Sequence, residues 1–200
     1  MYSKFFKPLF DFIAALFGIL IMLLPMAVIA VAVLVSSPGP VFYTQKRVGK
    51  GKKLFTLIKF RTMKKGTPEV ATHLLAKPEE SITKVGGFLR KFSLDELPQL
   101  FNILTLKMSF VGPRPALWNQ DDLVEERDKY GANDVKPGLT GWAQINGRDE
   151  LSIPDKAKLD GEYVKRMSLG FDLKCFFGTF RSVVRHEGVV EGAKEEKKDA

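Results

Sequence analysis

The segment that most constrains the fold is an uncharged, strongly apolar stretch near the N-terminus, residues 12–35. About 20 consecutive apolar residues are enough for a helix to cross the hydrocarbon core of a bilayer. Pro25 lies near the middle of the stretch, where its ring would clash with the Ile21 carbonyl and kink a helix. Three structures fit this pattern: a cleaved signal peptide, a spanning helix, and a re-entrant hairpin whose ends share one membrane face.

Length and flanking charge discriminate between these structures. The stretch is too long for a signal peptide, although Ala30-Val31-Ala32 could serve as a cleavage site. Basic residues lie on both sides of it: Lys4, Lys7, Lys46, Arg47, Lys50, Lys52 and Lys53. A spanning helix therefore has no preferred orientation, whereas a hairpin places both basic flanks on the cytoplasmic face. Each half of a hairpin, about 12 residues, would be about 18 Å long and would reach the middle of the bilayer.

Two adjacent carboxylates, Asp95 and Glu96, follow Ser93 in a pattern typical of a capping box. The pattern predicts a helix that begins near Leu94, with an irregular first turn because Pro98 lacks an N–H group. The N-terminus of a helix favours both a carboxylate and a phosphate. Asp95 could therefore be a nucleophile for phosphoryl transfer, provided that a cation screens the repulsion. Acidic residues at helix starts are also common for stability alone.

Composition narrows the class of partner. Two hundred residues suit one compact domain, and the formal net charge of +8 suits nucleic acid or an anionic membrane surface. No nucleic-acid-binding motif or zinc-ligand spacing is present, so we expect a membrane and no nucleic acid. Cys175 lies in an apolar stretch and is interpreted as a buried, inert thiol. His73 and His186 lie in polar sequence and are assigned to solvent.

The remaining periodicity predicts a mixed domain. Residues 41–45 and 54–60 read as strands of a β-hairpin with a basic turn, and residues 64–80 read as a loop. Helices are expected over residues 82–92, 94–104 and 155–167. Residues 171–184 mix aromatic and basic side chains, which suits either a helix at the lipid headgroups or an ordinary core helix. Residues 189–200 form a charged tail that we expect to be disordered.

Four motifs resemble one family. Residues 90–115 and 136–148, together with the shorter segments 42–47 and 59–63, closely resemble the bacterial sugar transferases, also called monotopic phosphoglycosyl transferases. The resemblance runs from the N-terminus to about residue 185. It implies transfer of a sugar-1-phosphate from a UDP-sugar to undecaprenyl (polyprenol) phosphate through a covalent phosphosugar-aspartate, with release of UMP. That reaction is the first membrane step of bacterial glycoconjugate assembly.

The resemblance also implies site residues, a cofactor and a location. Asp95 and Glu96 are expected to be catalytic and to bind Mg²⁺. Phosphate or substrate binding is expected from Lys59, Arg90, Gly112, Pro113, Arg114, Arg148 and Asp160. Two departures stand out, because Leu24 replaces the serine that relatives place before the central proline, and residues 105–107 replace Lys-Gly-Asp. The family is monotopic in the bacterial cytoplasmic (inner) membrane, with its catalytic domain facing the cytoplasm.

The predicted fold is α+β and mostly helical. It comprises a re-entrant membrane helix-break-helix at residues 1–38 and a catalytic domain at residues 39–188, with a short β-hairpin and interfacial helices. Expected partners are a UDP-sugar, polyprenol phosphate and the lipid bilayer, with downstream glycosyltransferases as further candidates. The alternative function is a non-enzymatic, membrane-anchored basic scaffold that binds anionic lipids or a partner protein. A scaffold gives no reason for the motifs at residues 93–98, 112–115 and 137–148.

Overall fold

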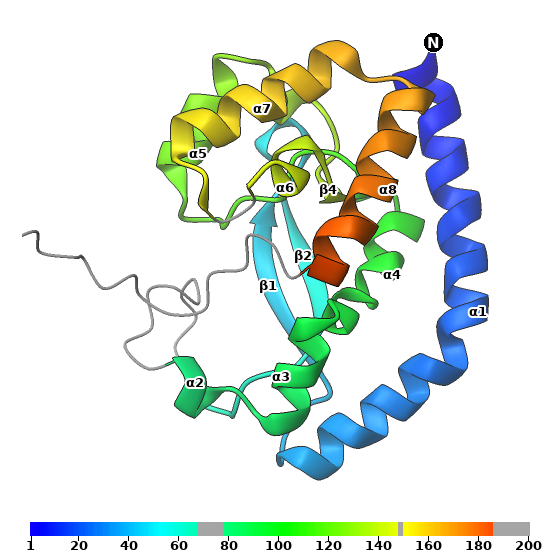
Figure 1. The fold of residues 1–200 in the computed structure, drawn as a ribbon, viewed down its shortest axis with the longest axis vertical. Coiled ribbons are helices and arrows are strands. Elements are labelled where there is room, and N and C mark those ends of the chain that lie inside the picture. The colour runs from blue at the N-terminus through cyan, green and yellow to red at the C-terminus, as the bar shows by residue number, and fades with distance from the viewer. Residues whose placement is uncertain (68–77, 148–149, 186–200) are drawn as a thin grey trace, which may run out of the picture.

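A long N-terminal helix lies along one side of a mixed helical and β domain in the computed structural model, which describes residues 1–67, 78–147 and 150–185 (Figure 1). The helix α1 (Lys7–Ser36) follows a short π-helical turn at Tyr2–Phe6. It bends along its length but continues through Pro25, so the predicted division into two separate helices is not found. A proline removes a single N–H group, and the helical bonds on either side of it can persist through a bend.

One face of α1 packs against the domain over most of its length. Its inward residues alternate at spacings of four and three, as a helix face requires: Ala15, Ile19, Met22, Met26, Ile29 and Val33. The first of these join a core with Leu57 and Ile103, and the later ones join a core with Phe60 and Leu89. The opposite face of α1 is exposed. Leu24 is 75% exposed and Val35 is 83% exposed, and the helix is long and apolar enough to cross a membrane.

The predicted β-hairpin is confirmed. Strands β1 (Phe42–Val48) and β2 (Leu54–Phe60) pair antiparallel, with Phe42 opposite Phe60 and Val48 opposite Leu54. The first strand runs three residues beyond its predicted end. Gly51 has a φ of 62° in the connecting turn Lys50–Lys52, a left-handed conformation that suits glycine.

A second, smaller sheet was not predicted. Strands β3 (Ser109–Val111) and β4 (Gly138–Thr140) pair in parallel, with Ser109 opposite Gly138 and Val111 opposite Thr140. The connection between them contains the helix α5 (Asp121–Asp128) and a 3-10 turn at Ala132–Asp134. Strands of three residues are too short for a period-2 pattern to reveal them.

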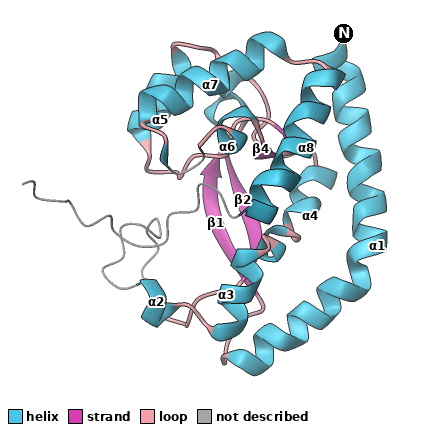
Figure 2. Cartoon of the chain, viewed as in Figure 1, coloured by secondary structure: helices cyan, strands magenta, loops and turns pink. Residues whose placement is uncertain are grey.

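Helices make up most of the rest (Figure 2). The predictions for residues 82–92, 155–167 and 171–184 are confirmed by α3 (Lys84–Lys91), α7 (Ile153–Arg166) and α8 (Leu169–Arg185). Short helices α2 (Pro78–Ser81), α4 (Gln99–Leu104) and α6 (Trp142–Ile145) complete the described chain. His73, His186 and the predicted tail lie outside the described residues, as does most of the predicted loop at residues 64–80.

Both interpretations of α8 find support in its two faces. Phe171 and Cys175 are buried in a core with Val111 and Tyr163, as expected for a core helix. The opposite face exposes large apolar side chains, namely Leu169, Leu173, Phe176 and Phe177. A helix with one core face and one bare apolar face is suited to lie at a membrane surface.

Candidate active site

The two predicted catalytic carboxylates lie where α3 gives way to α4. Ser93 adopts a left-handed conformation (φ 55°, ψ 22°), and its N–H donates to the Arg90 carbonyl, which ends α3. A single 3-10 turn, Leu94–Glu96, then carries both carboxylates before α4 begins. The irregular first turn expected from Pro98 is confirmed. The capping box is not found, because Ser93 makes no side-chain cap and Glu96 is engaged elsewhere.

Glu96 holds three separate chain segments together. Its Oε1 atom accepts from Lys59 Nζ on β2 at 3.1 Å and from Arg114 Nη2, in the loop after β3, at 2.7 Å. Glu96 is 8% exposed, so its carboxylate is largely shielded from water, while the Arg114 side chain is 32% exposed. Lys59, Glu96 and Arg114, which the sequence assigned to one site, are therefore brought together. Glu96 acts as the anionic centre around which the cations are arranged.

Asp95 lies in the same turn in a different setting. It is 8% exposed, and its carboxylate makes no hydrogen bond or ion pair with the part of the chain that the structure describes. Burial raises the pKa of Asp95 above its usual range and Glu96 adds to the rise, whereas Lys59, Arg90 and Arg114 oppose it. A carboxylate that is mostly buried and unbound by the described residues can act as a nucleophile.

Cations outnumber carboxylates around this turn. Arg90, whose Nε donates to Thr62 Oγ1 at 2.9 Å, lies close enough to favour the ionised form of Asp95. Arg47 donates to the Pro115 carbonyl and to Gln45 Oε1, and burial together with the neighbouring Arg114 lowers the pKa of Arg47 to about 10. Burial also lowers the pKa of Lys59, against the attraction of Glu96. The cations Arg47, Lys59, Arg90 and Arg114 against two carboxylates leave an excess positive charge that suits an anionic ligand.

The loop that carries Arg114 is fixed through its backbone. Gly112 N–H donates to the Thr140 carbonyl at 2.8 Å, and Gly138 N–H donates to the Pro113 carbonyl at 2.9 Å. A Cβ on Gly138 would lie 2.1 Å from the Gly112 nitrogen, so the two backbones approach too closely for any side chain. Downstream, Val48 N–H donates to the Ala116 carbonyl at 3.0 Å. Gly112 and Pro113 thus position Arg114, and the Gly112 N–H is already used within the protein.

One predicted site residue, Asp160, lies apart from this cluster. Asp160, on α7, is fully buried and accepts from Arg127 Nε at 2.8 Å and Arg127 Nη2 at 2.6 Å. Burial raises the pKa of Asp160, while Arg127 opposes the rise. This buried pair joins α7 to α5. Arg148 lies outside the described residues.

Arg47 is the member of the site that sequence reasoning missed. It stands in the quoted motif at residues 42–47, but it was read only as a membrane-flanking charge. The usable signal was the period of two in a strand, which places Gln45 and Arg47 on the same face of β1. Their side chains are indeed hydrogen-bonded to each other, Nη2 to Oε1, at 2.7 Å.

The sequence of this chain is similar to those of several named proteins. EpsL of Bacillus subtilis, an uncharacterised sugar transferase, is 43% identical over 188 residues, which is 92% of this chain and 89% of that protein. The undecaprenyl-phosphate galactose phosphotransferase of Salmonella typhimurium is 37% identical over 202 residues, which is 93% of this chain and 42% of that protein. The UDP-glucose:undecaprenyl-phosphate glucose-1-phosphate transferase of Escherichia coli is 40% identical over 184 residues, which is 88% of this chain and 40% of that protein. This chain therefore spans about two fifths of these two larger proteins.

The similarity extends over nearly the whole described chain. The family model of the bacterial sugar transferases matches residues 2–186, which include α1, the hairpin, the carboxylate turn and the arginine loop. With that match and a relative 43% identical over most of its length, this chain belongs to the bacterial sugar transferase family.

Proposed function

We propose that this protein transfers a sugar-1-phosphate from a UDP-sugar to undecaprenyl phosphate. The names of two relatives describe that reaction class, with galactose in one and glucose-1-phosphate in the other. The observation that carries the proposal is the contrast between the two carboxylates. Glu96 is neutralised by Lys59 and Arg114, while Asp95 lies beside the same cations without a partner among the described residues.

The first step joins Asp95 to the donor. A carboxylate oxygen of Asp95 attacks the sugar-bearing phosphorus of the UDP-sugar, forming an acyl phosphate (a mixed anhydride). The bond from that phosphorus to the bridging oxygen breaks, and UMP leaves with the electron pair. Arg114, Lys59 and Arg90 hold phosphate oxygens, and their charge offsets the repulsion between the anionic nucleophile and the diphosphate.

The second step regenerates the enzyme. A phosphate oxygen of undecaprenyl phosphate attacks the phosphorus of the sugar-phosphoryl-aspartate. The acyl phosphate bond between the phosphorus and the Asp95 oxygen breaks, which restores the carboxylate and yields undecaprenyl diphosphate sugar. Glu96 keeps Lys59 and Arg114 in place by the 3.1 Å and 2.7 Å contacts.

The residues present fit a magnesium ion that arrives with the donor. Among the described residues, no cluster of three or more acidic, histidine or cysteine side chains could hold a metal without help. Mg²⁺ is commonly held by one or two carboxylates together with substrate phosphates, and Asp95 with Glu96 meets that requirement. When bound, the ion supplies Lewis-acid charge at the diphosphate. We expect donor turnover to stop with a chelator and to return with magnesium.

The packing of α1 supports a monotopic arrangement, and the basic residues on both sides of the apolar stretch favour the cytoplasmic face of the inner membrane. Near one end, Lys7 Nζ bonds Asp172 of α8 at 2.6 Å. At the other end, the Ser37 and Pro38 carbonyls accept from Arg61 at the end of β2. A helix of 30 residues is about 45 Å long, which exceeds the bilayer core. With both ends held by one domain, α1 enters and leaves the membrane on the same face.

Two experiments test the function. Asp95→Asn keeps the shape but cannot attack phosphorus, so UMP release from UDP-sugars should be abolished while thermal unfolding is unchanged. With donor and magnesium present and undecaprenyl phosphate withheld, intact-protein mass spectrometry should find the sugar-phosphate mass on the peptide that contains Asp95. Turnover without any adduct in rapid-quench samples would mean direct transfer in a ternary complex.

A third experiment tests the topology. Cysteines introduced at Ser3 and at Lys52 should both react with reagent from the cytoplasmic side of inverted vesicles. Labelling of the Ser3 position only from the periplasmic side would instead mean that α1 spans the membrane.

A further inference from the structure

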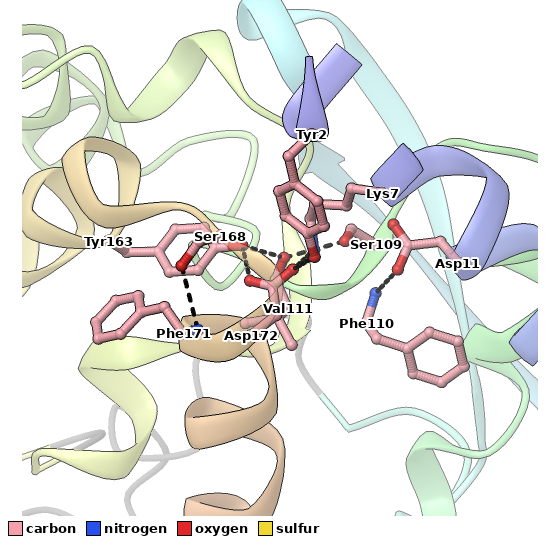
Figure 3. Close-up of polar contacts among 10 residues, drawn as sticks. All are labelled: Tyr2, Lys7, Asp11, Ser109, Phe110, Val111, Tyr163, Ser168, Phe171 and Asp172. Carbon is pink, nitrogen blue, oxygen red and sulfur yellow. Dashed lines mark hydrogen bonds and ion pairs between the residues drawn. The ribbon is translucent and has the colours of Figure 1, made fainter. Parts of the chain in front are cut away.

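A buried polar cluster joins the N-terminal part of α1 to α7, α8 and β3 (Figure 3). Asp172 lies at its centre, where Lys7 Nζ and Tyr2 Oη both lie 2.6 Å from its Oδ2. The Lys7 and Asp172 side chains are each 9% exposed. Tyr163, 1% exposed, donates to Asp172 Oδ1 at 2.7 Å. None of these groups has a part in the chemistry proposed above.

Asp11, one turn of α1 beyond Lys7, contacts β3 directly. Its Oδ1 atom accepts from the backbone N–H of Phe110 at 3.2 Å, across 99 positions of sequence. Phe110 is the middle residue of β3, and β3 pairs with β4 on one edge only. A side chain of α1 therefore completes the other edge of this strand (Figure 3).

The next residue of β3, Val111, is also contacted from outside the sheet. Tyr163 Oη also lies 3.0 Å from the Val111 carbonyl oxygen, so the hydroxyl bound to Asp172 touches β3 as well. Val111 is followed directly by Gly112, Pro113 and Arg114. Arg114 thus follows the last residue of β3 by only three positions, and the two intervening residues, Gly112 and Pro113, are hydrogen-bonded to β4 through their backbones.

The burial of Asp11 makes a purely structural role a poor explanation. Asp11 is 6% exposed, and its Oδ2 atom is buried without a partner among the described residues. A buried carboxylate with one unsatisfied oxygen weakens the packing of a helix against a core. The hydrogen bond that Asp11 accepts from Phe110 N–H offsets part of this cost.

We propose that Asp11 is a positioning residue for Arg114, acting through Phe110 and β3, with the Lys7–Asp172 pair holding α1 in register. The inference rests on the proposed function, in which Arg114 grips the diphosphate. It means that Arg114 is correctly placed to bind phosphate only when α1 is packed correctly against the domain.

The test compares Asp11→Ala, which removes the acceptor, with Asp11→Asn, which keeps an oxygen for Phe110 N–H. Ser36→Ala is the matched control, because it removes a polar contact at the far end of the same helix. Deuterium uptake of a peptide covering residues 109–114 is measured in full-length protein in detergent. We expect faster uptake in Asp11→Ala, and wild-type uptake in Asp11→Asn and Ser36→Ala. Unchanged uptake in Asp11→Ala would overturn the proposal.

Transfer from the UDP-sugar that wild-type protein accepts is the second readout. Loss of a buried hydrogen bond to a charged group predicts a fall in the transfer rate of about tenfold to a hundredfold in Asp11→Ala. Asp11→Asn should restore most of that rate. In an Arg114→Lys background, Asp11→Ala should cost much less, because the residue that it positions is already altered.

The outcomes separate the two proposals. The positioning role would be overturned if Asp11→Ala lowered the transfer rate by the same factor in the Arg114→Lys background as in the wild-type protein. It would also be overturned if Asp11→Asn were as slow as Asp11→Ala. If wild-type protein transfers no sugar phosphate from any UDP-sugar, the proposed function fails. The deuterium uptake arm still decides whether Asp11 holds β3.

Discussion

The buried pair Arg127–Asp160 allows a sharp test of whether Asp160 binds substrate or holds the fold. Asp160 Oδ2 accepts from Arg127 at 2.6 Å and 2.8 Å, and the two side chains are 4% and 1% exposed. Arg127→Met removes the partner and leaves a buried, uncompensated carboxylate, which costs about 3–5 kcal/mol of unfolding free energy. For a chain of this size, the midpoint of thermal unfolding should fall by roughly 6–20 °C.

The double variant Arg127→Met/Asp160→Leu is the control. Replacing both partners of a buried pair by apolar side chains is often close to neutral, so its midpoint should recover most of the loss. Thermal unfolding is followed in detergent, and transfer activity per folded molecule is measured well below both midpoints. Wild-type activity in the double variant is the expected result. A double variant with a wild-type midpoint and no transfer would refute this reasoning, and the prediction that Asp160 touches substrate would stand.

Three further predictions concern the site and the helix. Gly138→Ala should abolish soluble, active protein, because its methyl group would lie 2.1 Å from the Gly112 nitrogen, whereas Gly170→Ala, which meets nothing within 4 Å, should express and transfer normally. Because burial raises the pKa of Asp95, its carboxylate takes up a proton at a higher pH than an exposed aspartate does. The rate of single-turnover adduct formation should therefore fall on acidification before an ordinary aspartate would titrate, and a rate that does not change across that pH range would contradict the assignment. Arg61→Leu removes both bonds to the Ser37 and Pro38 carbonyls, so limited proteolysis after α1 should become faster, and an unchanged cleavage rate would show that Arg61 does not hold this end.

Much of the fold followed from patterns that a single segment carries. The apolar stretch, the hairpin and the three amphipathic helices each show their period within one element, so they were predictable locally. The division of α1 at Pro25 was wrong, because side chains along one face of α1, from Ala15 to Val33, pack onto the domain and favour one bent helix over two.

The site was predictable as a set of residues but not as an arrangement. The sequence assigned Lys59, Glu96 and Arg114 to one place, and the structure brings them together. The capping box failed because Glu96 is drawn to two cations that lie 18 and 37 positions away. The bond from Asp11 to Phe110 and the pair of β3 with β4 likewise depend on tertiary contacts, which no local pattern encodes.

The contact between the Gly112 and Gly138 backbones has a consequence for how this enzyme could change its substrate. Side chains cannot be added at either position without parting the strands, so neither glycine can be varied. Under the proposed function, Arg114 in this loop binds phosphate, which all nucleotide sugars share. On that proposal, discrimination between one sugar and another is encoded in other segments, and a laboratory search for altered sugar preference should leave Gly112 and Gly138 untouched.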